Sequence, residues 1–132
     1  YQKIKMIKGI GIDSVDQDRM ARIFSRYGQK FQDKILGPSE KEELKIRSHK
    51  FQKIRYLSNN FACKEAFSKV LGLGFREGVS LKEIEILRNE NGKPYIHLSG
   101  NTHKIADRLE IKNINVSITD TNNLSTAFVI GE

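Results

Sequence analysis

The stretch Phe61-Ala62-Cys63-Lys64-Glu65-Ala66-Phe67-Ser68-Lys69 places one carboxylate and two ammonium groups within a helical pattern of apolar residues. On a period of 3.6 residues, one apolar sector is formed by Cys63, Ala66, Phe67, Val70 and Leu71. The other side is followed by Ile54, Leu57 and Phe61, which end in line with Glu65. The pattern predicts a long, mostly buried helix over residues 50–71, with Lys64 and Lys69 projecting from it and Glu65 facing inward.

An inward-facing Glu65 needs a partner, because a carboxylate that leaves water loses hydration that only a cation or several donors can offset. The expected partners are a metal ion or Lys69, which lies one helical turn further along the chain. The alternative is an ordinary surface pair of opposite charges at positions i and i+4. Residues 61–69 alone leave both interpretations open.

A second acidic residue, Asp13, ends the segment 6–13, Met-Ile-Lys-Gly-Ile-Gly-Ile-Asp. Its isoleucines alternate with Gly9, Gly11 and Asp13, which predicts a strand with one nearly bare face. Glycines inside a strand cost stability and indicate the close approach of another backbone or of a ligand. Asp13 precedes a predicted helix and could equally serve as its N-cap. This segment alone does not decide between a ligand-binding and a capping role.

The rest of the chain alternates between helix and strand patterns without an internal repeat. Three further helices are predicted, over residues 20–27 up to Gly28, from a capping box at Ser39-Glu40-Lys41-Glu42, and over residues 102–109. Two hairpins are predicted, from strands 83–87 with 94–98 and from strands 114–119 with 127–130. Mixed helices and antiparallel strand pairs predict the α+β class, with an antiparallel-rich sheet and a long central helix.

The composition fits one compact domain: 132 residues, of which 38% are hydrophobic and 30% are charged. No apolar run approaches the roughly 20 residues that span a bilayer and no signal peptide is visible, so we expect no membrane span and a cytoplasmic protein. Cys63 is the only cysteine and lies on the apolar sector, which predicts inert packing. Residues 1–5 precede Met6 and are expected to be a cloning remnant rather than native sequence.

Four motifs follow one another along the chain. They are the strand Gly9-Ile10-Gly11-Ile12-Asp13 with Val15 and Arg19 after it, the helix Phe61-x-x-Lys64-Glu65-Ala66-x-x-Lys69 running into Gly72-x-Gly74, the turn Gly92-Lys93-Pro94-Tyr95-Ile96, and the strand Val116-Ser117-Ile118-Thr119. In this order they resemble the holo-acyl-carrier-protein synthases, the small bacterial phosphopantetheinyl transferases. The resemblance runs from about residue 6 to residue 130, and four motifs in register are far more specific than any one.

The resemblance implies a single phosphopantetheinyl transferase domain over residues 6–132. Such an enzyme moves the 4'-phosphopantetheine arm of coenzyme A to a serine of an apo acyl carrier protein in fatty acid biosynthesis, releasing adenosine 3',5'-bisphosphate. It implies a magnesium ion (Mg2+) on Asp13 and Glu65, with Glu65 and Lys69 as catalytic residues. The implied coenzyme A contacts are Ser68, Lys69, Gly72, Pro94, Asp120 and Thr121. The general base is left open between Glu65 and a metal-bound water.

Two positions depart from the family pattern. Many members have a histidine after the Ser-Ile-Thr strand, where this chain has Asp120 and then Thr121. Many also have an arginine before the phenylalanine of the central helix, where this chain has Asn60. Both positions are expected near coenzyme A, so the departures concern its contacts and leave the metal ligands intact. The three histidines, His49, His97 and His103, lack ligand spacing and are expected to be structural or surface residues.

The net charge of +7, from 23 basic and 16 acidic residues, points to an anionic partner. One basic stripe, beside the apolar face of the first predicted helix, is formed by Arg19, Arg22 and Arg26. It is either solvated surface or, as the resemblance implies, the binding site of an acidic carrier protein. A second basic group consists of Lys45, Arg47, Lys50, Lys53 and Arg55. Contact with coenzyme A phosphates and plain solvent exposure are equally compatible with this group.

The resemblance also implies a homotrimer with an active site between neighbouring subunits, in which the region of Pro94 comes from the next chain. A basic nucleic-acid-binding domain is one alternative, suggested by a pI near 9.6. The basic residues lack an interleaved aromatic platform, so we expect no nucleic acid partner. The same transfer to a polyketide or peptide synthetase carrier is a second alternative. Enzymes for those carriers are often a fused double of this unit, so a single copy favours the fatty acid carrier.

Overall fold

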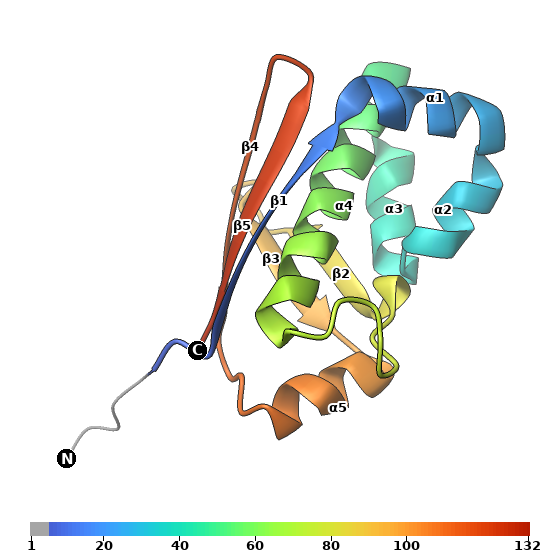
Figure 1. The fold of residues 1–132 in the computed structure, drawn as a ribbon. Coiled ribbons are helices and arrows are strands. Elements are labelled where there is room, and N and C mark those ends of the chain that lie inside the picture. The colour runs from blue at the N-terminus through green and yellow to red at the C-terminus, as the bar shows by residue number, and fades with distance from the viewer. Residues whose placement is uncertain (1–5) are drawn as a thin grey trace.

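The computed structural model of the chain describes residues 6–132 (Figure 1). The prediction about residues 1–5 lies outside this range. The elements in chain order are β1 (Gly9–Asp16), α1 (Gln17–Tyr27), α2 (Gln29–Ile35), α3 (Pro38–Ile46), α4 (Lys50–Leu71), the 3-10 helix η1 (Leu81–Glu83), β2 (Ile84–Arg88), β3 (Pro94–Leu98), α5 (Gly100–Arg108), β4 (Ile114–Thr121) and β5 (Leu124–Gly131).

The strands form two antiparallel sheets, a three-stranded one in the order β1-β5-β4 and the hairpin β2-β3. The turn between β4 and β5 places Asn122 and Asn123 at φ values of 50° and 62°, the left-handed conformation that two-residue hairpin turns require and asparagine tolerates. In Figure 1, α4 stands between the three-stranded sheet on one side and α1–α3 on the other. The predicted α+β class with a long central helix is confirmed, and the antiparallel pairing is divided between two sheets.

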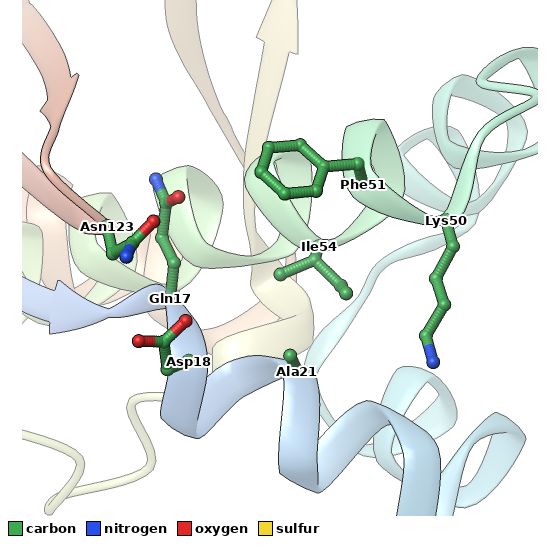
Figure 2. Close-up of a pocket in the computed structure, with 7 residues that line it drawn as sticks. All are labelled: Gln17, Asp18, Ala21, Lys50, Phe51, Ile54 and Asn123. Carbon is green, nitrogen blue, oxygen red and sulfur yellow. The ribbon is translucent and has the colours of Figure 1, made fainter.

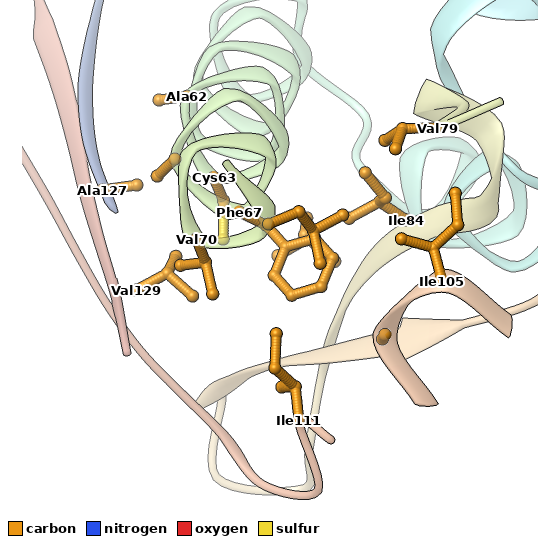
Figure 3. Packing of buried hydrophobic residues seen from close by; sticks show 14 residues of the cluster. Ala62, Cys63, Phe67, Val70, Val79, Ile84, Ile105, Ile111, Ala127 and Val129 are labelled. Carbon is orange, nitrogen blue, oxygen red and sulfur yellow. The ribbon is translucent and has the colours of Figure 1, made fainter. Parts of the chain in front are cut away.

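Helix α4 is the centre of two hydrophobic clusters. The first packs α4 against the three-stranded sheet, β2 and α5, with Phe67 in its middle (Figure 3). The second packs α4 against α1, α2 and α3, and is built from Met20, Ile35, Leu36, Leu44, Tyr56 and Leu57. Because apolar neighbours surround α4 on most sides, its own residues are buried all around its axis.

The first strand and the helix that follows differ from the prediction. β1 continues to Asp16, and Asp16 caps α1 by accepting hydrogen bonds from the backbone N–H groups of Asp18 (2.8 Å) and Arg19 (3.2 Å). Capping by Asp13 is therefore excluded, and its carboxylate is left for another role. α2 has only seven residues and was not predicted, because so short a segment shows no clear period.

The start of α3 was predicted two residues too late. The predicted capping box began at Ser39, whereas the helix begins at Pro38 after the cap residue Gly37. Glu40 Oε1 accepts a hydrogen bond of 3.0 Å from the Gly37 backbone N–H. The carboxylate that caps α3 is thus Glu40 rather than Glu42.

Candidate active site

The glycines of β1 allow this strand to touch the backbone of α4. A Cβ atom at Gly9 would lie 2.3 Å from the Val70 carbonyl oxygen, and one at Gly11 would lie 1.8 Å from that of Ala66. The predicted close approach is confirmed, and the approaching group is the α4 backbone. Moving from Gly9 to Gly11 goes back one turn of α4, so the two elements run in opposite directions.

Asp13 is the next residue on this face of β1 and lies one turn closer to the start of α4. Helical side chains lean towards the helix N-terminus, so the long side chains of Glu65 and Lys69 reach back towards it. Asp13 and Glu65 line a single cleft of about 470 Å³ between β1, α1 and α4. The glycine contact therefore brings together two carboxylates that are 52 positions apart in the sequence.

Lys69 pairs with Asp13 rather than with Glu65. Its Nζ donates a hydrogen bond of 2.7 Å to the Ile12 carbonyl and lies 3.3 Å from Asp13 Oδ1. Of the two partners expected for Glu65, a metal ion or Lys69, the second forms its ion pair with Asp13 instead, because the close approach of β1 offers the ammonium two acceptors.

The negative charge of the Glu65 carboxylate is poorly neutralised by its surroundings. Partial burial raises its pKa, the negative charge of Asp13 raises it further, and the positive charge of Lys69 offsets only part of this. Within residues 6–132 the Glu65 carboxylate takes part in no ion pair or hydrogen bond. Two carboxylates in one cleft, with one ammonium paired to Asp13, favour the binding of a further cation.

The donor set fits a hard divalent cation. Magnesium is commonly held by one or two carboxylates, with water and substrate phosphates completing its octahedral shell. No group of three His, Cys, Asp or Glu residues that could hold a metal is found in the described part of the chain. Asp13 and Glu65 suit an ion that shares its shell with a phosphate, and they do not suit a fully enclosed protein cage.

The predicted coenzyme A residues do not converge on this cleft within one chain. Ser68 is buried, and its Oγ donates to the Glu65 carbonyl at 2.6 Å. Gly72 is the left-handed residue that ends α4, with φ of 74°, and Pro94 begins β3. None of these three residues lines the cleft that holds Asp13.

Asp120 lies beside a different, basic cleft. Its Oδ2 accepts a hydrogen bond of 3.0 Å from Asn59, and its Oδ1 is 3.6 Å from Arg55 Nε. Asn59 and Arg55 line a cleft of about 500 Å³ together with Arg47 and Arg88. Arg88 was not singled out from the sequence, because a single arginine before a turn carries no signal.

Asp13 and Asp120 lie on the two edge strands of the sheet, β1 and β4, with β5 between them. Both are partly buried at positions that alternate with the exposed residues of their strands. α4 covers the face of the sheet towards which they point. Thr121 is exposed at the end of β4.

One residue of the central motif, Lys64, lies where the sequence did not predict it. Lys64, expected to project outward, is completely buried and forms an ion pair of 2.6 Å with buried Glu40. Asn60, expected near coenzyme A, is completely buried and donates hydrogen bonds to Glu40 Oε2 and to the Ile86 carbonyl. The prediction for Cys63 is confirmed: it is buried, and burial raises the pKa of its thiol to about 12.

The arginine stripe of α1 is exposed, and only its first member reaches the cleft. Arg19 lines the cleft together with Asp13, whereas Arg22 and Arg26 lie further along the helix. The three histidines are exposed, as expected for surface residues. None of the helices between residues 6 and 132 is both long enough and apolar enough to cross a membrane.

A smaller hollow of about 390 Å³ lies where the start of α1 meets the first half of α4 (Figure 2). Two of its four polar side chains are engaged: Gln17 donates to Ser125 at 2.9 Å, and Lys50 donates to Ser25 at 3.1 Å. Lys50 belongs to the second basic group, of which Arg47 and Arg55 lie in the basic cleft instead. This hollow lacks the paired carboxylates of the cleft around Asp13.

Comparisons of the sequence and of the fold with known proteins indicate one family. The family model described as the 4'-phosphopantetheinyl transferase superfamily matches residues 9–129. A holo-[acyl-carrier-protein] synthase of Blochmanniella pennsylvanica is 40% identical over 127 residues, which are 96% of this chain and 99% of that protein. One from Halothermothrix orenii is 38% identical over 127 residues, covering 96% and 98%.

The fold comparison agrees. The crystal structure of the Neisseria meningitidis holo-[acyl-carrier-protein] synthase matches with a TM-score of 0.88 and 35% identity, covering 96% of this chain and 99% of that one. The Helicobacter pylori synthase, solved in complex with coenzyme A, matches with a TM-score of 0.78 and 31% identity, covering 93% and 99%. The chain therefore belongs to the 4'-phosphopantetheinyl transferase superfamily, as one of its holo-acyl-carrier-protein synthases.

Proposed function

We propose that this chain transfers the 4'-phosphopantetheine arm of coenzyme A to a serine of an apo acyl carrier protein, as a magnesium-dependent enzyme of fatty acid biosynthesis in the cytoplasm. The observation that carries the proposal is the cleft in which Asp13 and Glu65 meet beside Lys69, in a chain of this family. Their arrangement offers one place for a cation and for the negatively charged pyrophosphate of coenzyme A.

Asp13 and Glu65 would hold the magnesium ion, which when bound neutralises the charge that develops on the pyrophosphate oxygens. Lys69 has three N–H donors, of which two meet the Ile12 carbonyl and Asp13. The third donor remains for a phosphate oxygen of the substrate. The carrier serine attacks the phosphorus that bears the pantetheine arm, its hydroxyl proton passes to Glu65 or to a water molecule, and the P–O bond to adenosine 3',5'-bisphosphate breaks. No covalent intermediate on the protein is required, so the chain acts by positioning and electrostatics.

The acceptor side of the cleft suits an acidic protein. Arg19 stands at the cleft that holds Asp13, and Arg22 and Arg26 continue the positive charge along α1. Opposite charges on the carrier would steer it towards the cleft and orient its serine. These three arginines are therefore proposed as the carrier-binding residues.

The outer face of the three-stranded sheet supports an oligomer. Ile10 and Ile12 are 60% and 56% exposed, and Phe128, which pairs with Ile12 across the strands, is 39% exposed. An apolar group of this kind on a sheet favours contact with another chain. We propose a homotrimer in which Pro94, Asp120 and Thr121 of one subunit complete the coenzyme A site around Asp13 of its neighbour.

A mixing experiment tests the shared site. Asp13→Asn and Asp120→Ala are each expected to reduce transfer strongly, and the two variants are mixed in equal amounts after dissociation and reassembly. If each site needs Asp13 from one subunit and Asp120 from the next, about a quarter of the sites in the mixture are intact, and activity returns to about that fraction. No recovery, or full activity of a monomer in analytical ultracentrifugation, contradicts the shared site.

The transfer itself is tested by mass spectrometry. Apo acyl carrier protein is incubated with this chain, coenzyme A and magnesium, and the mass of the carrier is expected to rise by one phosphopantetheine arm. Omitting magnesium is the first control, and apo carrier domains of polyketide and peptide synthetases are offered in parallel. No gain on any carrier refutes the proposal, and a gain only on the synthetase domains reassigns the substrate.

A further inference from the structure

The rotation of α4 about its own axis decides where Glu65 points, and both apolar packing and polar contacts act on that rotation. The helix is buried nearly all the way round, and many of its packed side chains are small, such as Ala62, Cys63 and Ala66. Hydrophobic burial itself has no preferred direction, so polar contacts of defined geometry add precision that burial alone does not supply.

Several residues of α4 form directional contacts with other elements, and two of the completely buried ones, Lys64 and Asn60, meet the same carboxylate. Glu40 Oε1 is 2.6 Å from Lys64 Nζ, and Glu40 Oε2 accepts a hydrogen bond of 2.8 Å from Asn60. Lys64 and Asn60 are four positions apart and so lie on one face of the helix. All three residues are completely buried, so water does not compete for these bonds.

The other groups that hold Lys64 and Glu40 come from the framework around α4. Lys64 also donates to the carbonyls of Leu81 (2.8 Å) and Ile84, at the start of the hairpin β2-β3. Glu40 accepts from the backbone N–H of Ile86 in β2, in addition to its bond with the Gly37 N–H that starts α3. The pair therefore ties α4 to α3 and β2 at one point.

From this geometry we infer that the buried Lys64–Glu40 ion pair is a positioning device that sets the rotation of α4 and so holds Glu65 opposite Asp13. The inference rests on the proposed role of Glu65 as a cation ligand. Lys64 and Glu65 are consecutive and project about 100° apart around the helix, so fixing the first fixes the direction of the second. A carboxylate about 6 Å from the axis moves about 2 Å when the helix turns by about 20°. Binding sites tolerate displacements of their ligand atoms of only about 0.5 Å.

Stability alone does not account for this pair. Removing two charges from water costs about as much as their attraction returns, and apolar replacements of buried pairs are often neutral or stabilising. What such a pair adds is specificity of arrangement, as a single buried polar residue does for the register of a coiled coil. Lys69 gives a weaker constraint, because its side chain is 52% exposed and its bonds compete with water.

The test compares the double variant Lys64→Met/Glu40→Gln, which removes both charges, with Thr102→Val. Thr102 is also completely buried and its Oγ1 donates to Glu83 at 2.8 Å, but it lies on α5 and holds no part of the cleft. Thermal unfolding reports stability, calorimetry reports magnesium binding, and mass spectrometry reports transfer. We expect the double variant to fold, to bind magnesium at least tenfold more weakly and to lose at least tenfold in kcat. Thr102→Val is expected to lower the Tm while keeping magnesium binding within twofold.

Each outcome decides one point. A folded double variant with magnesium affinity and kcat within twofold of the wild type overturns the inference. If the double variant does not fold, Glu40→Gln decides, because it removes the carboxylate of the ion pair while keeping a side chain of the same shape. Two- to fivefold weaker magnesium binding is expected, and unchanged binding overturns the inference. A wild-type chain that binds magnesium but transfers nothing refutes the proposed function. The positioning inference is then still tested, because calorimetry compares magnesium binding by the wild type and by the variants.

Discussion

Replacing Glu65 by glutamine should stabilise the folded chain while abolishing its function. The carboxylate is partly buried, lies in one cleft with Asp13 and lacks a hydrogen-bond donor within residues 6–132. Two like charges that lie close together at a partly solvated site repel by about 1 kcal/mol. Solvent screening and Lys69 reduce this, so the free energy of unfolding should rise by about 0.5–1 kcal/mol at pH 7, or about 2–5 °C in Tm.

The stability difference between Glu65→Gln and the wild type depends on pH. Because the pKa of Glu65 is raised in the folded state, the protonated form is the one that folding favours. The benefit of protonation is complete below the unfolded pKa of about 4.3 and is lost as pH rises through the folded pKa. Glu65→Gln, which imitates the protonated form, should therefore differ little from the wild type near pH 4 and should be the more stable protein at pH 7.

Magnesium should make the wild type more stable than Glu65→Gln at pH 7. At ten times its dissociation constant a ligand stabilises the folded state by about 1.4 kcal/mol, and the variant is expected to lose most of this gain along with most of its turnover. Thermal unfolding at pH 4 and pH 7, with and without magnesium, measures all four values, and Glu90→Gln on the exposed turn between β2 and β3 is the matched control. A Glu65→Gln chain that is no more stable than the wild type at pH 7 without magnesium, yet gains as much from magnesium, would refute the reasoning.

Three further predictions concern packing, the carrier and assembly. Gly11→Ala places a Cβ 1.8 Å from the Ala66 carbonyl oxygen and should lower the free energy of unfolding by about 3 kcal/mol in urea titrations; a loss below about 1 kcal/mol contradicts the close contact. Arg19→Glu should raise the KM for the acidic carrier about tenfold and leave that for coenzyme A unchanged, with Lys112→Glu as the control; a KM that responds to neither Arg19→Glu nor added salt removes the residue from the carrier site. Phe128→Glu should dissociate the proposed trimer in analytical ultracentrifugation, and an unchanged sedimentation coefficient argues for another interface.

The elements with a strong periodic signal were predicted well. The bounds of α4 agree with the predicted 50–71, and both hairpins lie where the turns Asn89–Gly92 and Thr121–Asn123 indicated. The misses have local causes. The seven residues of α2 are too few for a period, and β1 was ended too early because Asp13 resembles a helix cap. Asp16 does the capping instead, so the residue that looked like a cap is the one left for the site.

The buried ion pair between Lys64 and Glu40 could not be predicted from one sequence. A lysine beside a glutamate on a helix is normally read as a solvated residue, and nothing near Lys64 shows that it is buried. Its partner Glu40 lies 24 positions earlier and served in the prediction only as part of a cap. Pairings of this kind are set by the tertiary contact between α3 and α4, which periodicity does not encode.

The glycines on one face of β1 show how much a strand pattern predicts about a ligand site. Gly9 and Gly11 predicted the close approach of either another backbone or a ligand. The structure shows that the approaching group is the backbone of α4. The two readings are not alternatives in the end, because it is the backbone contact that creates the ligand site. Any side chain at Gly11 would hold α4 away from β1, and the carboxylate of Glu65 would then move away from Asp13 by a similar distance. Those glycines are thus a requirement of the proposed cation site as much as of the packing, although neither of them would touch the cation.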